Sequence, residues 1–383
     1  MRRFAVGTVW LVLSVIALAQ SVDRPRARDI GLAPGSLSPG ALNAITDVPG
    51  VRVGQTTVIE GTSIRTGVTA ILPHGGNLFQ SKVPGAVFVG NAFGKLAGST
   101  QVEELGTIET PIVLTNTLAV GTAMDAVVRW TLAQAGNTNV RSVNALVGET
   151  NDGTLNDIRS MPVTREHVLA ALNSATDGAV QEGAAGAGAG TIAFGWKGGI
   201  GTSSRVVLQR RTINGQPLPD LRATVGVLVQ TNFGGKLTIG GVPVWKTLTP
   251  GSNGASSALG SADGSCMIVV ATDAPLDARD LKRLAARAVF ALARTGSTYS
   301  NGSGDFAIAF STFEGNRVTT SPGAQSRNFL PTDDVSPLFE AALDATEEAV
   351  YNSLLKATDV TSNGRTLRAL PIDKLRALLT QVR

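Results

Sequence analysis

The chain has 383 residues, and its 33 lysines and arginines outnumber its 29 aspartates and glutamates, giving a formal net charge of +4. Because these basic residues are scattered, the sequence lacks the clustered positive charge of a nucleic-acid-binding protein. One cysteine excludes an intrachain disulfide, and two histidines argue against a histidine-rich zinc site, so we expect neither a metal nor a cofactor.

Residues 1–19 have the features of a secretory signal peptide. Two arginines at positions 2 and 3 precede an apolar run over residues 4–18, and small residues precede a cleavage site after position 19. The alternative is a membrane anchor, but the run is shorter than the roughly 20 residues that a membrane-spanning helix needs. We therefore expect a periplasmic or secreted protein without a membrane partner, whose residues 20–383 form a single domain.

The rest of the chain alternates irregularly between predicted strands and helices. Short runs rich in β-branched residues indicate strands, and apolar residues at helical spacing indicate helices. In chain order we predict strands over 51–59, 66–73 and 86–90, a helix over 120–135, a strand over 142–148, a helix over 164–174, strands over 191–196, 205–209, 223–230 and 266–272, a helix over 277–293, a strand over 306–312 and a helix over 336–355. This bunching favours a layered α+β fold with helices covering packed sheets over a doubly wound parallel sheet.

Two of the predicted helices have recognisable start signals. Asp277 precedes one of them and is of a residue type that commonly caps a helix N-terminus. Ser336 and Pro337 are typical of an N-cap followed by a first-turn proline.

The string GAAGAGAGT at residues 183–191 raises the alternative of a nucleotide-binding loop. Such a loop needs a strand before it and a helix that opens within it. Here a predicted strand follows the glycines instead. We therefore expect a flexible or closely packed glycine segment.

Gly264 and Ser265 stand between a glycine- and serine-rich loop and an apolar strand. Attack of the serine hydroxyl on the glycine carbonyl would give an ester that water can open, and glycine tolerates the contorted backbone that such an attack requires. The freed α-amine, with a pKa of about 8 in model compounds, could then act as the general base of Ser265. This chemistry needs no histidine, whereas a triad would require His74, in a predicted turn, or His167, in a predicted helix. On the residues alone, a DGS sequence before a strand is equally an ordinary turn.

Cys266 adjoins the proposed nucleophile and is itself a candidate. Successive side chains of a strand face opposite sides, so Ser265 and Cys266 cannot both face one site. The apolar neighbours of Cys266 favour a packed core residue.

Many ordered segments make the chain similar to the family of DmpA-type L-aminopeptidase/D-esterases and β-peptidyl aminopeptidases. The segments that carry the resemblance are RARDIGL, NAITDVPGVRVGQTT, GVTAILPHG, GETNDGTLND, GGIGTSSR, GVLVQTNFG, ADGSCMIVVATDAPL and NGSGDFAIAFST. The resemblance implies a four-layer αββα sandwich like that of N-terminal-nucleophile hydrolases. It also implies self-cleavage of one catalytic domain into an α chain, 20–264, and a β chain, 265–383, which stay associated in a homo-tetramer or homo-octamer.

The resemblance also assigns roles around the cleavage site. Ser265 matches the family's nucleophile, and Gly264 matches the residue on the other side of the cut. Ser303 and Asp305, in NGSGD, match a serine and a carboxylate that hydrogen-bond near the nucleophile and tune its amine. On the residues alone, NGSGD is equally a glycine-rich hairpin loop.

Three further residues are assigned by the resemblance to substrate contacts. Asn232, in VQTNFG, matches an asparagine that stabilises the oxyanion, and Glu149, in GETNDG, matches an acidic residue that binds the substrate amine. Asn151 stands where some members carry an oxyanion-donating tyrosine, so its role stays open. Without the resemblance, these residues could simply form turns, since NDG is a strong turn signal.

These observations predict a self-processing serine aminopeptidase. It would remove N-terminal residues from peptides, amides or esters through an acyl-enzyme on Ser265. The alternatives are an acyltransferase on the same scaffold, although the ornithine acetyltransferases use threonine as nucleophile, and a non-catalytic periplasmic binding protein. The sequence leaves the preference among L-α-, D- and β-amino acyl groups open.

Overall fold

The computed structural model describes residues 24–213, 216–250, 264–320 and 323–382. The predicted signal peptide lies outside these residues, as does most of the loop before Gly264. No helix within the described ranges is long and apolar enough to cross a membrane.

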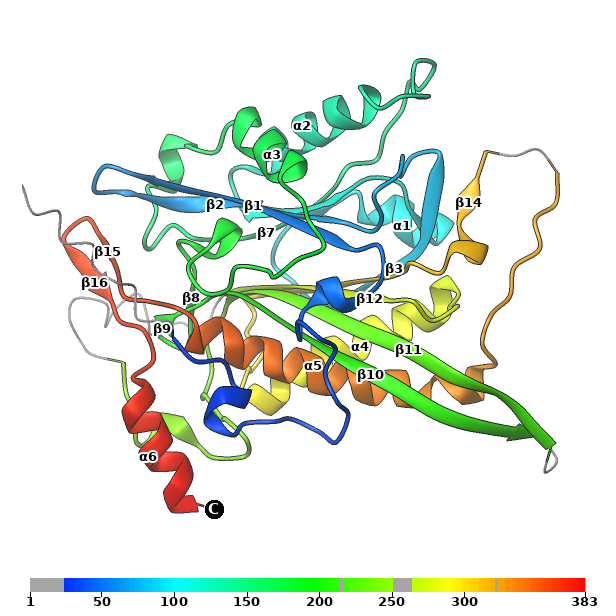
Figure 1. Ribbon diagram of the computed structural model, residues 1–383. Coiled ribbons are helices and arrows are strands. Elements are labelled where there is room, and N and C mark those ends of the chain that lie inside the picture. The colour runs from blue at the N-terminus through cyan, green and yellow to red at the C-terminus, as the bar shows by residue number, and fades with distance from the viewer. Residues whose placement is uncertain (1–23, 214–215, 251–263, 321–322, 383) are drawn as a thin grey trace, which may run out of the picture.

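Two β-sheets pack face to face between two layers of helices (Figure 1). One sheet has the strand order β1 (Arg52–Glu60), β2 (Ile64–Leu72), β6 (Ile112–Asn116), β7 (Leu146–Thr150) and β4 (Leu96–Ala97). The other has the order β10 (Gly199–Ile213), β11 (Gln216–Asn232), β12 (Ser265–Thr272), β13 (Gly304–Ser311), β3 (Ser81–Ala92) and β14 (Val318–Thr319), with β5 (Thr107–Ile108) also paired to β3. The neighbours β6 and β7 run parallel, as do β12 and β13.

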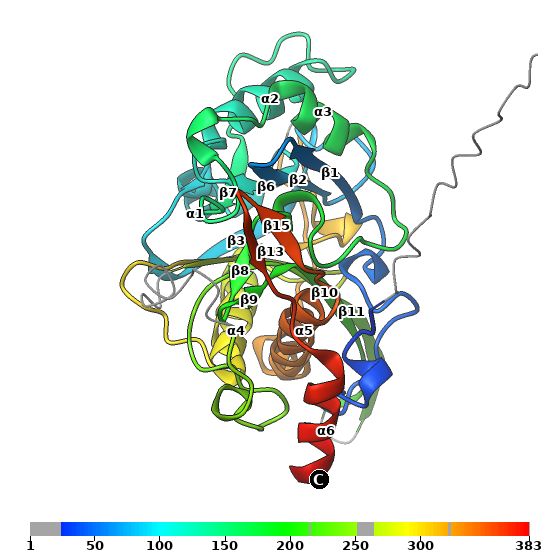
Figure 2. The same ribbon diagram turned by 90° about the vertical axis from the view of Figure 1, so that its left-hand side faces the viewer.

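Helices close both outer faces of this sandwich, as Figure 2 shows from the side. α2 (Val120–Leu132) and α3 (Arg165–Asn173) pack on the five-stranded sheet, while α4 (Ala278–Thr295) and α5 (Ser336–Leu355) pack on the seven-stranded sheet. The smaller elements are α1 (Ser99–Leu105), α6 (Ile372–Val382) and the pair β15 (Val360–Ser362) and β16 (Arg365–Leu367). The expected four-layer αββα sandwich is therefore confirmed.

Strand β12 shows how the sequence builds these layers. Every residue of the strand is buried, as its dense run of β-branched and apolar residues predicts. Cys266 and Ile268 pack in the core beneath the helices, whereas Met267 and Val269 pack between the two sheets. Strand alternation thus directs the side chain of Ser265 toward the space between the sheets.

Most predicted elements are present, and three predictions differ from the structure. The predicted strand over 142–148 begins only at Leu146, in β7. The predicted strand 191–196 is a tight hairpin of β8 (Ile192–Ala193) and β9 (Trp196–Lys197), because Phe194 and Gly195 between them adopt positive φ angles. Asp277 is confirmed as an N-cap, accepting a hydrogen bond from the backbone of Asp280 at 2.8 Å. Ser336 as an N-cap was wrong, because it is the first residue of α5 itself.

The glycine segment 183–191 is closely packed rather than a nucleotide loop. A Cβ atom on Gly188 would lie 2.5 Å from the backbone nitrogen of Ile200, and one on Gly190 would lie 2.1 Å from the carbonyl oxygen of Arg65. The glycines therefore allow the segment to pass between strands of the two sheets.

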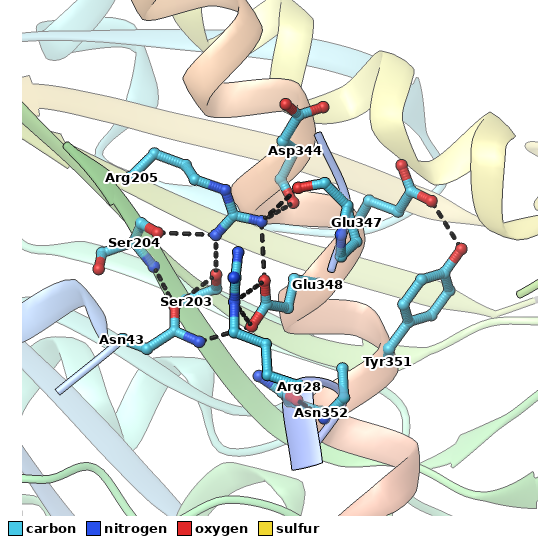
Figure 3. Close-up of polar contacts among 12 residues, drawn as sticks. Arg28, Asn43, Ser203, Ser204, Arg205, Asp344, Glu347, Glu348, Tyr351 and Asn352 are labelled. Atoms are coloured by element: carbon cyan, nitrogen blue, oxygen red, sulfur yellow. Dashed lines mark hydrogen bonds and ion pairs between the residues drawn. The ribbon is translucent and has the colours of Figure 1, made fainter. Parts of the chain in front are cut away.

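A buried ion pair ties the N-terminal segment and β10 to α5 (Figure 3). Arg205 and Glu348, both fully buried, lie 2.7 Å apart. Arg28 pairs with the same carboxylate at 3.0 Å, and Asn43 donates a hydrogen bond to it at 2.5 Å. A buried charge is tolerated when it is paired and hydrogen-bonded in this way. Three stretches far apart in the sequence are thereby fixed to one another.

Candidate active site

Ser265 lies where three strands of the seven-stranded sheet meet at their ends. It is the first residue of β12, directly opposite Asn232 at the end of β11 and Gly304 at the start of β13. Residues paired directly across strands have Cβ atoms about 5 Å apart. The register therefore places the asparagine side chain next to the serine side chain.

The Ser265 hydroxyl and the Gly264 carbonyl converge on one backbone donor. The N–H of Gly304 donates to the Gly264 oxygen at 3.0 Å and to the Ser265 Oγ at 3.3 Å. This donor polarises the carbonyl that the serine would attack, as an oxyanion-hole N–H does. No sequence pattern marks this donor, because a backbone N–H is present at almost every position.

Gly264 packs closely against the end of β11 and the residue that follows it. A Cβ atom there would lie 2.2 Å from the carbonyl oxygen of Asn232 and 2.5 Å from the Cα of Phe233. Both contacts are with backbone, which cannot swing aside as a flexible side chain can.

We predict that Gly264→Ala slows cleavage of the 264–265 bond about 100-fold. The added Cβ would displace the carbonyl relative to the hydroxyl, and a misplacement of about 1 Å costs on the order of that factor. The time course of cleavage on denaturing gels measures the effect. Gly121→Ala is the matched control, because a Cβ atom at this helical glycine meets nothing within 4 Å. Cleavage of the Gly264 variant at the wild-type rate would contradict the packing argument.

Both the oxygen and the nitrogen of the Asn232 side-chain amide are hydrogen-bonded. Its Oδ1 accepts a hydrogen bond from the N–H of Ile192, and its Nδ2 donates to the carbonyl of Asn151, each at 3.0 Å. The amide keeps a second N–H on the same nitrogen. A donor so fixed beside Ser265 is suited to stabilising an oxyanion.

Asn151 reaches the site chiefly through its backbone. Its side-chain Oδ1 accepts a hydrogen bond from the N–H of Gly153 at 2.9 Å, as in an Asx turn, and the residue is exposed. The turn interpretation of this side chain is thus supported by the geometry. Its carbonyl serves to orient Asn232.

Glu149 approaches the site from the other sheet. It lies near the end of β7 and is only 2% exposed. Its Oε1 accepts the backbone N–H of Lys95 at 2.9 Å and lies 3.6 Å from the Nζ of the same lysine. That ammonium also donates to Thr117 Oγ1 at 2.8 Å. The carboxylate is therefore anchored and available to a cation in the pocket.

One pocket of about 1460 Å³ connects these groups. Ser265, Gly264, Asn232, Asn151 and Glu149 all contribute to its lining, so the structure brings together five of the seven predicted site residues. The pocket opens between the ends of strands from both sheets. It can hold an acyl group whose amine faces one sheet while its carbonyl faces the other.

Ser303 and Asp305 lie behind the pocket rather than in its lining. Ser303 donates a hydrogen bond to Oδ1 of Asp305 at 2.9 Å, and Oδ2 has no hydrogen-bond partner among the described residues. Asp305 pairs with Cys266 across the strands and therefore points toward the helix side of the sheet. Burial raises the pKa of its carboxyl to about 6, although the hydrogen bonds from Ser303 and the Cys266 backbone oppose the rise.

The competing nucleophile and bases are placed elsewhere. His74 is buried in the turn after β2, with its Nε2 2.8 Å from the carbonyl oxygen of Ser81. His167 accepts the N–H of Thr164 at the start of α3. Neither histidine lines the pocket. Cys266 is fully buried in the core, and burial raises the pKa of its thiol well above the usual value.

Lys95 is a pocket residue that the sequence reasoning missed. It stands in NAFGKLAG, just after β3, where neither periodicity nor a known spacing marks it. Only the pairing of β4 with β7 brings this segment next to Glu149. In the described ranges, no group of three or more histidine, cysteine, aspartate or glutamate side chains is placed to hold a metal ion.

Comparison with known proteins gives consistent matches over nearly the whole chain. A family model described as Peptidase family S58 matches residues 43–367. The chain is 42% identical over 398 aligned residues to the beta-peptidyl aminopeptidase BapA of Sphingosinicella microcystinivorans, covering 96% of this chain and 95% of that protein.

Two solved structures are also similar, and each alignment covers 94% of this chain and 99% of the chain in the solved structure. The L-aminopeptidase D-Ala-esterase/amidase of Ochrobactrum anthropi, a prototype of the serine aminopeptidases with a variant of the Ntn hydrolase fold, matches with a TM-score of 0.84 at 38% identity. A beta-aminopeptidase of a Burkholderia species matches with a TM-score of 0.82 at 39% identity.

Proposed function

The chain belongs to peptidase family S58 and is an aminopeptidase, and from this premise we propose that Ser265, freed by cleavage after Gly264, is its nucleophile. One observation carries the proposal. The Ser265 hydroxyl and the Gly264 carbonyl share the N–H of Gly304, next to the anchored amide of Asn232. This arrangement supports the proposal, because the proposed nucleophile, the carbonyl that it would attack and the candidate donors lie together in the uncut chain.

Maturation follows from this geometry in two steps. The Ser265 Oγ attacks the Gly264 carbonyl carbon, its proton passes to the departing backbone nitrogen, and the C–N bond breaks to leave an ester. Water then hydrolyses the ester, which releases the Gly264 carboxylate and restores the hydroxyl. The new α-amine lies on the same residue as the nucleophile, and no histidine is needed.

The same groups would then act on substrate. The α-amine takes the Ser265 proton as the hydroxyl attacks the substrate carbonyl, Asn232 donates to the developing oxyanion, and Glu149 pairs with the substrate ammonium. The proton passes to the leaving amine, and water resolves the acyl-enzyme. Binding of the ammonium restricts cleavage to the first residue.

We extend the proposal to N-terminal β-amino acyl residues, because two of the relatives are β-aminopeptidases. The test is release of p-nitroaniline from 3-aminobutanoyl p-nitroanilide, with the N-acetylated compound as control. We expect hydrolysis of the free amine and at least about 100-fold less of the acetylated form, since acetylation removes the charge that Glu149 would bind. Equal rates for the two compounds would refute aminopeptidase selectivity, and no turnover of either would refute β-amino acyl specificity.

The buried Asp305 carboxyl gives a prediction about stability and pH in the uncut Ser265→Ala protein. Its pKa of about 6 in the folded state lies above the ordinary 3.8, so the folded protein binds more protons between these values. The unfolding free energy should therefore fall as the pH rises from about 4 to 6, by up to roughly 3 kcal/mol.

Adding Asp305→Asn to this protein should remove the fall, since the amide does not ionise and its oxygen can still accept from Ser303. Denaturant unfolding at pH 4 and pH 7 measures both proteins. The pH-dependent loss should shrink in the double variant, and an unchanged loss would show that another group causes it.

Export and assembly complete the proposal. We propose that residues 1–19 are removed on export to the periplasm or medium, supported by the basic start and apolar run of that segment. We further propose a homo-tetramer or homo-octamer of cleaved units, supported by the family resemblance. Sedimentation of the cleaved protein tests the second point.

A further inference from the structure

Lys95 places a positive charge directly beside the carboxylate that would bind the substrate amine. Its Nζ lies 3.6 Å from Glu149 Oε1, and its side chain is 56% exposed while that of Glu149 is 3% exposed. The ammonium is tethered to Thr117 Oγ1 at 2.8 Å. It thus sits at the open side of the buried carboxylate, within the lining of the pocket.

Glu149 does not need the lysine side chain to hold its position. The backbone N–H of Lys95 donates to Oε1 at 2.9 Å, and any residue except proline at this position would retain that bond. The ammonium is therefore an additional feature of the pocket.

When an acyl residue with an uncharged side chain binds, the positive charges in the pocket outnumber the negative ones. Within the described part of the lining, the charged side chains are Lys95, Lys236 and Glu149. A substrate ammonium on Glu149 would share this one carboxylate with Lys95, and two like charges so close disfavour each other. A carboxylate carried by the substrate beside its amine would pair with Lys95 and lower the excess positive charge by one.

Building on the proposed function, we propose that the site takes N-terminal β-aspartyl residues, with the ammonium on Glu149 and the α-carboxylate on Lys95. In a β-aspartyl residue the amine and a free carboxylate share one carbon, and the scissile carbonyl is one methylene away. This is the spacing of a β-amino acyl group. An ordinary α-linked residue cannot bind in this way, because the carboxyl on its amine-bearing carbon is the scissile one. Hydrolysis of the C–N bond of the β-aspartyl amide, through the acyl-enzyme, gives free aspartate and the leaving amine or shortened peptide.

The test compares three p-nitroanilides: β-aspartyl, its α-carboxamide isostere and 3-aminobutanoyl. In the wild-type enzyme we expect kcat/KM for the β-aspartyl compound to exceed that for the carboxamide at least tenfold, mainly through KM. Lys95→Met should remove this advantage and raise kcat/KM for the 3-aminobutanoyl compound. Lys95→Arg should retain the preference, because it retains the charge. Lys246→Met is the matched control, since its ammonium lies over the Trp245 ring and the residue does not line the pocket, so the substrate ratio should stay within about twofold of the wild type.

The outcomes separate the two proposals. Hydrolysis of the 3-aminobutanoyl compound without a preference for β-aspartyl over carboxamide would overturn the inference and leave the proposed function standing. An undiminished preference in Lys95→Met would also overturn it. Failure of the wild-type enzyme to cleave any of the three would overturn the proposed β-amino acyl specificity, and this inference with it. The wild-type comparison needs no variant and stands even where a variant fails to fold.

Discussion

Ser265→Ala is expected to yield a single uncut chain with at least about 1000-fold less hydrolytic activity than the wild type. The substitution removes the hydroxyl that attacks the Gly264 carbonyl, so neither the ester nor the free α-amine forms. Loss of the nucleophile removes both catalytic steps, whereas donors and binding groups alone give only residual rates. Denaturing electrophoresis with N-terminal sequencing should show a second wild-type chain that begins at Ser265 and is absent from the variant.

Cys266→Ala is the matched control for this experiment. Cys266 adjoins Ser265 but packs in the core beneath the helices, on the opposite side of β12. Truncating it disturbs packing without touching the proposed chemistry, so this variant should still be cut and remain active. A wild-type chain that stays intact yet hydrolyses substrate would contradict the maturation scheme.

The layers of the fold could be predicted because each strand and helix carries its own pattern. The run of β-branched residues in β12 predicts a strand. The apolar face of α4 and the cap at Asp277 predict a helix. The start of α5 could not be read in this way. The 3-10 turn Thr332–Val335 continues directly into the helix, so the chain is already helical at Ser336. The serine and proline that signal a helix start therefore place the N-cap one residue too far along the chain.

The site was harder to predict because it depends on register between distant segments. Asn232 and Ser265 are neighbours only because β11 and β12 pair with these two residues opposite each other. No spacing along the sequence encodes that contact, and by themselves both residues look like parts of turns. The family resemblance indicated the candidate site residues. It also includes segments away from the site, such as GGIGTSSR, whose Arg205 forms a buried ion pair. Only the geometry separates the two kinds of residue.

Asn232→Ala is expected to lower kcat of the mature enzyme about 100-fold or more, with a smaller change in KM. The amide would donate to a charge that grows on the substrate oxygen in the transition state, and loss of one such donor costs on this order. Steady-state kinetics with a p-nitroanilide substrate measures the effect, on protein first shown to be cut at Ser265. Cleavage itself should also slow if the same amide assists attack on Gly264.

Asn151→Ala distinguishes a specific donor from general disturbance of the pocket. Asn151 lies beside Asn232 and lines the same pocket, but its side-chain oxygen closes a turn at Gly153, and its carbonyl is retained in the variant. We expect a loss of less than about tenfold, because the backbone acceptor that orients Asn232 remains. Equal losses in the two variants would assign an oxyanion role to Asn151 as well. A near-normal kcat in Asn232→Ala would instead leave the Gly304 N–H as the donor that stabilises the oxyanion.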